Sequence, residues 1–196
     1  MEEILALTVG YAVGSLPFAF LIAQCRGVDL RRAGSGNVGA ANVLRTSGVL
    51  SAMATMCLDV GKGAVVVMVV QRLFGGPPTS VVAGLAAIIG HVYPVWLGFR
   101  GGKGVATAAG VFMMLAPVAA AMAVAVFVVV TLVTRYISVG SISAAVTLVA
   151  AAVAINVSPV VTIGAAVAAV IVVHRHRGNL GRLLAGTESK VGERVF

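Results

Sequence analysis

The sequence predicts an all-α integral membrane protein, and its composition and the length of its apolar runs are the two observations that predict it. Of the 196 residues, 60% are hydrophobic and 10% are charged, against about 45–50% and 25% in soluble globular domains. A soluble fold is excluded. A membrane-spanning helix needs about 18 or more consecutive apolar residues. We expect residues 1–196 to form one membrane-embedded domain, because five stretches reach that length: residues 4–24, 50–73, 80–97, 105–133 and 142–173.

The first apolar run is expected to stay in the mature chain as a helix. It follows Met1, Glu2 and Glu3 without any Lys or Arg, so it lacks the basic segment that begins a cleavable signal peptide. The two cysteines, Cys25 and Cys57, fall at a helix end and inside a span. This placement indicates neither a disulfide framework nor a zinc site.

The basic residues gather in the segments between and after the apolar runs, and the formal net charge is +8. The positive-inside rule places such segments in the cytoplasm. The N-terminus and the turn at residues 75–78 are then outside, and the C-terminus is cytoplasmic. The surplus charge fits either anionic lipid headgroups or anionic substrates. Nucleic acid is not an expected partner, because the basic loops carry few aromatic side chains for base stacking.

The last two apolar runs are each too long for one ordinary span. As one straight helix, residues 105–133 would be about 44 Å long, against a hydrocarbon core of about 30 Å. Each long run contains a proline near its middle, Pro117 or Pro159, which kinks a helix or ends it. Two kinked helices give five spans, and two split runs give seven. We favour about seven short helices, because only this count places Arg135, Ser138 and Ser141 on the cytoplasmic side with the other basic loops.

The first basic loop contains a glycine-rich motif, GSGNVGAANVLR, at residues 34–45. It matches GxGxxG formally, and Asp59 follows at the spacing of a ribose-binding acid. We reject a dinucleotide-binding fold, because the flanking segments are membrane helices rather than a strand and its crossover helix. The glycines still let the backbone approach an anion, and Ser35, Asn37 and Asn42 add hydrogen-bond donors. The alternative is close glycine packing between helices.

The second basic loop reads GFRGGKGVAT at residues 98–107. A nucleotide-binding P-loop would need glycine at position 97 and Ser or Thr at position 104, whereas the sequence has Leu97 and Gly104. Nucleotide hydrolysis is therefore not predicted. Lys103, flanked by glycines at the start of a helix, can still bind a phosphate through its charge. The alternative is a lysine that snorkels at the membrane edge.

A histidine and an asparagine in the tail are the candidate catalytic side chains. His176 in its neutral form can accept or donate a proton near neutral pH, and Asn179 shares its face if the helix continues. A basic stop signal next to the membrane would look similar. Inside the membrane, Asp59 and Lys62 are expected to pair at i, i+3, either for structure or for proton relay. His91 is expected to be a hydrogen-bonded helix contact.

Three segments together resemble the bacterial membrane glycerol-3-phosphate acyltransferases that use acyl phosphate as donor. They are GSGNVGAANVLR at 34–45, HVYPVWLGFRGGKGVAT at 91–107 and HRGNLGRLLAGTESK at 176–190. The resemblance spans almost the whole chain. It implies a seven-helix, multi-pass protein of the bacterial cytoplasmic (inner) membrane, with its active site facing the cytoplasm. It also implies the reaction of acyl phosphate with glycerol 3-phosphate to give 1-acylglycerol 3-phosphate and phosphate. Ala41 departs from the family, which usually has Thr there, so a role for position 41 is in doubt.

The motifs and the resemblance predict three groups of site residues. The acyl phosphate is expected at Gly34, Ser35, Gly36, Asn37, Gly39 and Asn42. The glycerol 3-phosphate is expected at Arg45, Gly101, Gly102, Lys103, Gly104 and Ser141. The catalytic residues are expected to be His176, Asn179 and Ser35, with Arg182 and Glu188 in support. His176 is either a general base or a hydrogen-bond partner, in which case the donor's own phosphate takes the proton.

No cofactor and no metal are predicted, and the expected partners are the two substrates and membrane lipids, with no obligatory protein partner. A lipid-headgroup phosphotransferase is a rival class. It would need several acids near the membrane edge for divalent metals, whereas the acids past the N-terminus are scattered. A transporter of a small anionic solute is the main alternative. It would place polar groups at the bilayer midplane between repeated halves, whereas the glycine motifs lie at span ends and no repeat is visible.

Overall fold

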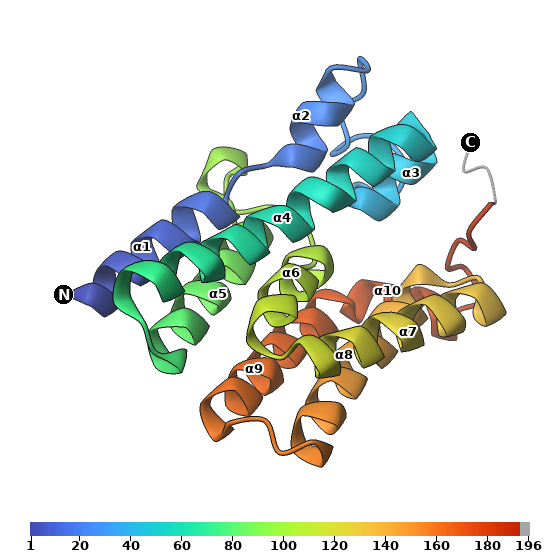
Figure 1. The fold of residues 1–196 in the computed structure, drawn as a ribbon. Helices are drawn as coiled ribbons and strands as arrows, with labels where there is room; N and C mark the ends of the chain where they lie inside the picture. Colours follow the sequence, from blue (N-terminus) through green and yellow to red (C-terminus); the bar gives the residue numbers. More distant parts are fainter. Residues whose placement is uncertain (193–196) are drawn as a thin grey trace.

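The computed structural model describes residues 1–192, and all regular structure within them is helical (Figure 1). The elements are α1 (Glu2–Gly14), α2 (Phe18–Gln24), α3 (Ala40–Ser47), α4 (Val49–Phe74), α5 (Pro77–Val92), the 3-10 turn η1 (Val95–Leu97), α6 (Val105–Leu115), α7 (Pro117–Thr134), α8 (Ile137–Ala154), α9 (Pro159–Arg175) and α10 (Arg177–Leu184). The expected all-α membrane fold is confirmed.

Both long apolar runs are split at their prolines, as the seven-helix count requires. α6 ends at Leu115 and α7 begins at Pro117, while α9 begins at Pro159. Proline suits the first helical position because its missing N–H would have no partner there. Five helical segments are long and apolar enough to cross a membrane, and the bent pair α9–α10 makes a sixth. Together with the shorter apolar helix α6, residues 1–192 contain the seven apolar segments expected.

The first span is broken rather than continuous. α1 ends at Gly14 and α2 begins at Phe18, so the single helix expected over residues 4–24 has an irregular segment near its middle. Pro17 stands directly before α2 and has no N–H to donate to α1. The carbonyl of Leu16 lies in this break, outside both helices, and accepts the Phe18 backbone N–H at 3.1 Å.

Glycine and alanine bring the helices into close contact. α1, α4 and α5 pack together on one side of the molecule and α7, α8 and α9 on the other, with α6 between them (Figure 1). A Cβ atom added to Gly10 of α1 would lie 2.3 Å from the Ala83 carbonyl oxygen of α5. A Cβ on Gly110 of α6 would lie 1.9 Å from the Val60 carbonyl oxygen of α4. Small residues allow this approach in membranes, where helix association depends on packing.

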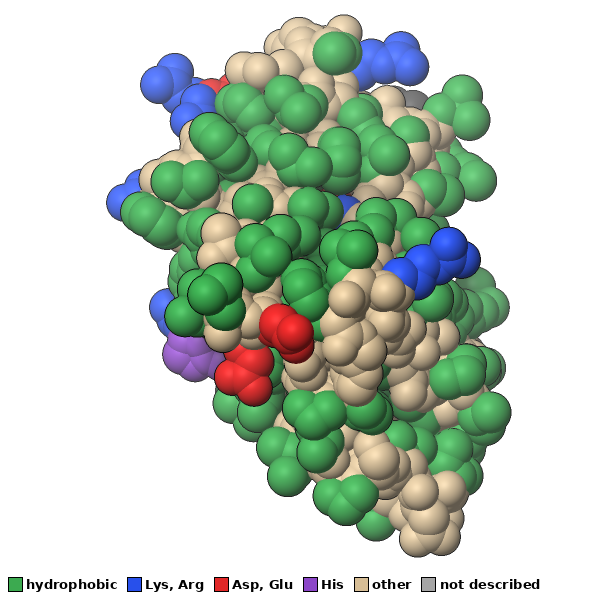
Figure 2. Space-filling model, turned by 60° about the vertical axis from the view of Figure 1, so that its left-hand side comes forward, with side chains coloured by type: hydrophobic (Ala, Val, Ile, Leu, Met, Phe, Trp, Pro, Cys, Tyr) green, Lys and Arg blue, Asp and Glu red, His purple; other side chains and the backbone are tan. Residues whose placement is uncertain are grey.

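The outer surface is largely apolar. Figure 2 shows hydrophobic side chains covering most of the visible face, with few charged groups between them. Leu132, Val133 and Val170 are large exposed hydrophobic residues on α7 and α9. A soluble protein would bury such a surface. A lipid bilayer accommodates it, which agrees with the integral membrane assignment.

Three polar segments meet at one end of the helix bundle: the first loop with α3, the α7–α8 turn, and the tail. Arg45 donates a hydrogen bond to the carbonyl of Ser189, and Ser138 at the start of α8 donates one to Glu188. The Arg135 side chain donates to the carbonyl of Val191 at 2.8 Å. The first loop, the α7–α8 turn and the tail therefore lie together. This agrees with the seven-helix count, which puts Arg135 beside the other basic segments.

Candidate active site

Glu188 is the centre of a buried hydrogen-bond network in the tail. Its Oε1 atom accepts hydrogen bonds from Ser138 Oγ at 2.9 Å and from the Asn179 side-chain amide. Its Oε2 atom accepts one from Arg182 Nε at 2.8 Å. Burial raises the pKa of the Glu188 carboxyl, but these three hydrogen bonds outweigh burial and hold the pKa below its usual value of 4.5. Glu188 is therefore an anion at neutral pH and orders its three donors.

Lys103 extends this network into the second glycine loop. Its ammonium donates a hydrogen bond to the Asn179 side-chain oxygen, so the Asn179 amide links Lys103 to Glu188. Burial lowers the pKa of Lys103 from 10.5 to about 8. Glu188 opposes this shift, and the positive charges of three neighbours add to it: Arg182, Arg45 and Arg175. Lys103 thus lies among three arginines and one carboxylate, and such an excess of positive charge attracts a polyanion such as phosphate.

Two arginines tie the site together through backbone carbonyls. Arg45 of α3 donates to the Ser189 carbonyl oxygen at 3.3 Å, and Arg175 at the end of α9 donates to the Gly101 carbonyl oxygen at 3.3 Å. The first hydrogen bond therefore connects α3, which follows the first loop, to the tail. The second connects the end of α9 to the second loop. Ser141 lies one turn after Ser138, and its hydroxyl donates to the Ile137 carbonyl of α8.

The first glycine loop is held from inside by Asn42. The Asn42 side-chain oxygen accepts the Ser35 backbone N–H at 2.9 Å, and its amide nitrogen donates to the carbonyls of Leu30 and Ala33. Asn42 is 0% exposed. Its side chain therefore secures the loop, which is a different task from the phosphate donor expected of it. Ser35 itself is exposed and leaves its hydroxyl at the surface.

Glycines of the first loop are needed for its backbone path. Gly34 and Gly36 have φ angles of +58° and +70°, a region that suits glycine. A Cβ on Gly34 would lie 2.3 Å from the Asn42 side-chain oxygen, and a Cβ on Gly39 would lie 3.1 Å from the Asn37 side-chain nitrogen. Asn37 is partly exposed. The loop is therefore compact and presents Ser35 and Asn37.

The second glycine loop packs against the end of α5. The N–H groups of Gly101 and Gly102 donate to the carbonyls of Val92 and His91, both at 3.1 Å. These two amides are therefore occupied in the structure by the end of α5, although sequence reasoning expected them around a phosphate. Gly104 has a φ of +86° and precedes α6. The loop places the Lys103 side chain against Asn179. Two residues later, α6 begins at Val105.

His176 sits at the junction of α9 and α10 and is buried, with 2% of its surface exposed. Its Nδ1 atom lies 2.7 Å from the Val172 carbonyl oxygen. A carbonyl only accepts, so Nδ1 carries the proton and Nε2 is the basic nitrogen. Burial lowers the pKa of His176 to about 4, and the charge of Lys103 adds to the effect. His176 is thus neutral at physiological pH, and its pKa is well below the ordinary histidine value near 6.5.

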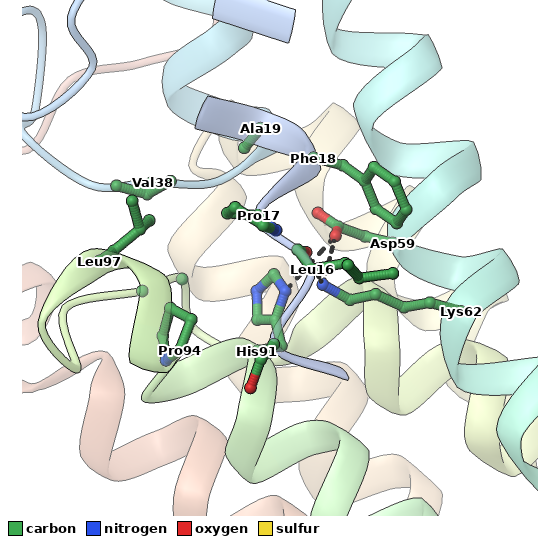
Figure 3. Close-up of a pocket in the computed structure, with 13 residues that line it drawn as sticks. Leu16, Pro17, Phe18, Ala19, Val38, Asp59, Lys62, His91, Pro94 and Leu97 are labelled. Carbon is green, nitrogen blue, oxygen red and sulfur yellow. Dashed lines mark hydrogen bonds and ion pairs between the residues drawn. The ribbon is translucent and has the colours of Figure 1, made fainter. Parts of the chain in front are cut away.

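A second buried polar cluster lies between α4 and α5 (Figure 3). Lys62 Nζ is 2.9 Å from Asp59 Oδ1, so the expected i, i+3 ion pair is confirmed. His91 also contacts this ion pair, because its Nδ1 atom lies 3.5 Å from the same Asp59 oxygen. The cavity beside them measures about 10 Å³, which is about the volume one water needs. It is too small for either proposed substrate.

Sequence reasoning missed two residues that complete the site. Ser138 and Arg175 were not among the candidates, although each bonds to the tail or to the second loop. Ser138 lies at the start of α8, three residues after Arg135, and this nearby basic residue was the available signal. Within residues 1–192, no group of three or more His, Cys, Asp or Glu residues is arranged to hold a metal ion.

The chain is similar to known proteins over almost its whole length. The family model described as glycerol-3-phosphate acyltransferase matches residues 4–186. The glycerol-3-phosphate acyltransferase of Geobacter sulfurreducens is 45% identical over 97% of this chain and 98% of its own. That of Brucella anthropi is 45% identical over 95% of this chain and 92% of its own.

Solved structures show the same architecture. One is the crystal structure of PlsY (YgiH), an integral membrane glycerol 3-phosphate acyltransferase, in its glycerol 3-phosphate form. Its comparison with this chain gives a TM-score of 0.94 and 37% sequence identity. The match covers 98% of this chain and 96% of that one. The lysophosphatidic acid form of the same protein has a TM-score of 0.91 and 36% identity. The chain therefore belongs to the glycerol-3-phosphate acyltransferase family of integral membrane proteins.

Proposed function

We propose that this chain transfers a fatty acyl group from acyl phosphate to the 1-hydroxyl of sn-glycerol 3-phosphate, giving 1-acylglycerol 3-phosphate and phosphate. The observation that carries the proposal is the cationic cluster around Lys103, to which all three sequence motifs contribute. Both substrates carry a phosphate, and a site of positive charge attracts such anions. The product then begins phospholipid synthesis. A transporter of anionic solutes is the weaker candidate, because the family is one of acyltransferases.

Acyl phosphate is the donor that best suits this set of residues. It is an activated mixed anhydride, so no protein nucleophile is needed, and orientation of two bound reactants supplies roughly 7–11 kcal/mol. The sequence has no histidine followed five residues later by aspartate, the pair that thioester-using glycerolipid acyltransferases carry. In the reaction, the glycerol hydroxyl oxygen bonds to the acyl carbon. The bond from that carbon to the phosphate oxygen breaks, and phosphate leaves.

Each phosphate is assigned to one glycine loop. We assign Lys103, Arg45 and Ser141 to the phosphate of glycerol 3-phosphate, which the two cations bind by charge. Ser35 and Asn37 of the first loop bind the acyl phosphate. The support for this division is that Ser35 presents a free hydroxyl, whereas Lys103 is half-buried among arginines.

His176 is assigned to the reacting hydroxyl together with Asn179. The low pKa of His176, about 4, makes its Nε2 a poor proton acceptor at neutral pH, since a general base works best with a pKa near the working pH. We infer that Nε2 accepts a hydrogen bond from the hydroxyl and aligns it. The departing phosphate, itself basic near neutral pH, takes the proton.

The active site is assigned to the cytoplasmic side of the bacterial inner membrane. Among the basic residues of 1–192, only Lys62 and Arg72 lie away from the segments at the site end. Positive residues favour the cytoplasmic side of a membrane. The N-terminus, with Glu2 and Glu3, is then outside.

The deciding experiment uses the purified full-length protein in lipid nanodiscs. It receives palmitoyl phosphate with and without sn-glycerol 3-phosphate, and both phosphate and lysophosphatidate are measured. We expect one lysophosphatidate for each phosphate, formed only with glycerol 3-phosphate present, and none from palmitoyl-coenzyme A. Phosphate release without lysophosphatidate would show a hydrolase. Product from the coenzyme A thioester would show that the donor is wrongly assigned.

A further inference from the structure

A series of contacts leads from the break in the first span toward the second glycine loop, through Lys62, Asp59 and His91 (Figure 3). Lys62 Nζ donates to the Leu16 carbonyl oxygen at 2.9 Å, where the α1–α2 break leaves that carbonyl outside a helix. Asp59 neutralises the Lys62 ammonium, and His91 Nδ1 lies beside the same carboxylate. The contacts join the broken span, α4 and α5 at one point.

His91 connects this series of contacts to the second glycine loop. Its backbone carbonyl accepts the Gly102 N–H. A Cβ on Gly102 would lie 2.2 Å from His91 Nε2 and 2.9 Å from the Val38 carbonyl oxygen. Gly102 is therefore enclosed between the imidazole and the backbone of the first loop. The next residue along the chain is Lys103.

Packing alone does not account for three ionisable side chains inside a membrane protein. Buried ion pairs are costly to desolvate, and apolar residues of similar volume are often at least as stabilising. A carboxylate beside one imidazole nitrogen does something that an apolar residue cannot, because it fixes the orientation of the ring. With Nδ1 held at Asp59, the opposite nitrogen Nε2 faces Gly102.

We propose that His91, oriented by the Asp59–Lys62 pair, is a positioning residue that holds Gly102 against Val38 and so sets the place of the Lys103 ammonium in the anion site. The proposal rests on the proposed function in taking glycerol 3-phosphate as the anion. His91 itself does not touch the substrate. Its loss therefore weakens binding of glycerol 3-phosphate more than it slows the chemical step.

The test compares His91→Phe with Ile89→Phe, both as full-length protein in nanodiscs. His91→Phe keeps a ring beside Gly102 and leaves the Asp59–Lys62 pair balanced, but it removes the nitrogen that faces Asp59. Ile89 is 39% exposed on the same helix, so Ile89→Phe is the matched control. The first readout is hydrogen exchange of the amides at residues 101–103, and the second is the KM and kcat for glycerol 3-phosphate.

In His91→Phe we expect amide exchange at residues 101–103 to be at least about tenfold faster, because loosened segments open locally. We expect the KM for glycerol 3-phosphate to rise about tenfold, with kcat within about threefold of wild type. Ile89→Phe should match wild type in both readouts. His91→Gln, whose amide N–H can still reach Asp59, should lie between wild type and His91→Phe, and it decides the question if His91→Phe does not fold.

Unchanged exchange at residues 101–103 in the folded variants would overturn the proposal, and so would an unchanged KM in a variant whose exchange is faster. A loss of kcat in proportion to lost folded protein would show a purely structural cluster, which also overturns it. Failure of the proposed function is recognised separately, because the wild-type protein would then make no lysophosphatidate. The exchange measurement still decides in that case whether His91 holds the loop.

Discussion

Lys103 donates a hydrogen bond to the side-chain oxygen of Asn179, 76 positions later in the chain. The nitrogen of the same amide donates to Glu188. Reversing the amide would turn its N–H groups toward the ammonium and its oxygen toward the carboxylate, and both contacts would be repulsive. Asn179 is therefore fixed in one orientation by two opposite charges. The second glycine loop and the tail therefore act as one unit.

Lys103→Met should raise the KM for glycerol 3-phosphate by at least about tenfold while changing kcat less, because a charge-assisted hydrogen bond to phosphate is typically worth about 1.5–3 kcal/mol. Methionine keeps much of the side-chain volume and removes the charge. The measurement is initial-rate kinetics with each substrate varied in turn. A raised KM for acyl phosphate and an unchanged one for glycerol 3-phosphate would mean that the two phosphate sites are exchanged.

Glu188→Gln should move the alkaline limit of glycerol 3-phosphate binding to lower pH. The negative charge of Glu188 raises the pKa of Lys103, which burial and neighbouring arginines lower to about 8. Without that charge the pKa of Lys103 falls further, so its ammonium is lost at a lower pH and the KM begins to rise earlier. The measurement is the KM for glycerol 3-phosphate from pH 6 to pH 9. Glu3→Gln, at the opposite end of the molecule, is the matched control, and a profile for Glu188→Gln that equals the control would contradict the argument.

Ser35→Ala should reduce turnover by about tenfold or more, since the exposed hydroxyl is one of the two side-chain donors that the first loop offers to acyl phosphate. The Ser35 backbone N–H bonds to Asn42 and is unaffected by the substitution. Ser158→Ala is the control: Ser158 is exposed and makes no side-chain cap hydrogen bond at the start of α9. Full activity in folded Ser35→Ala would remove this residue from the site.

The architecture could be predicted from sequence because proline and apolar length act locally. Pro117 and Pro159 each begin a helix in the structure, and their effect on helix boundaries depends only on the missing N–H and fixed φ. The break at Pro17 follows the same rule. It was missed because the run around it has the length of a single span, so no excess length indicated a break.

The site could be predicted only in part, because a motif identifies donors without showing what they bind. Asn42 stands in the first motif as a phosphate donor would, yet asparagine side chains also bond to nearby backbone, and here Asn42 bonds to its own loop. Ser138 and Arg175 reach the site because the tail folds back over α8 and the second loop. Contacts of that kind follow from tertiary packing, which no local pattern encodes.

His176 provides the last prediction, which separates a proton acceptor from a residue that aligns the hydroxyl. Its pKa is lowered to about 4 by burial, so it is neutral above pH 4 and becomes charged only below it. The kcat of the wild-type protein should therefore show no acidic limb near pH 6.5 that belongs to His176. Removing the hydrogen-bond acceptor in His176→Ala should lower kcat by about 10- to 100-fold.

His176→Asn should recover part of this loss, because an amide oxygen accepts a hydrogen bond but does not take a proton at neutral pH. The measurement is kcat against pH for wild type, His176→Ala and His176→Asn at saturating concentrations of both substrates. If wild type shows an acidic limb near pH 6.5 that both variants lack, and His176→Asn is as slow as His176→Ala, His176 is the base. Activity of His176→Asn well above that of His176→Ala, with no such limb in wild type, assigns the proton to the departing phosphate and leaves His176 to align the hydroxyl.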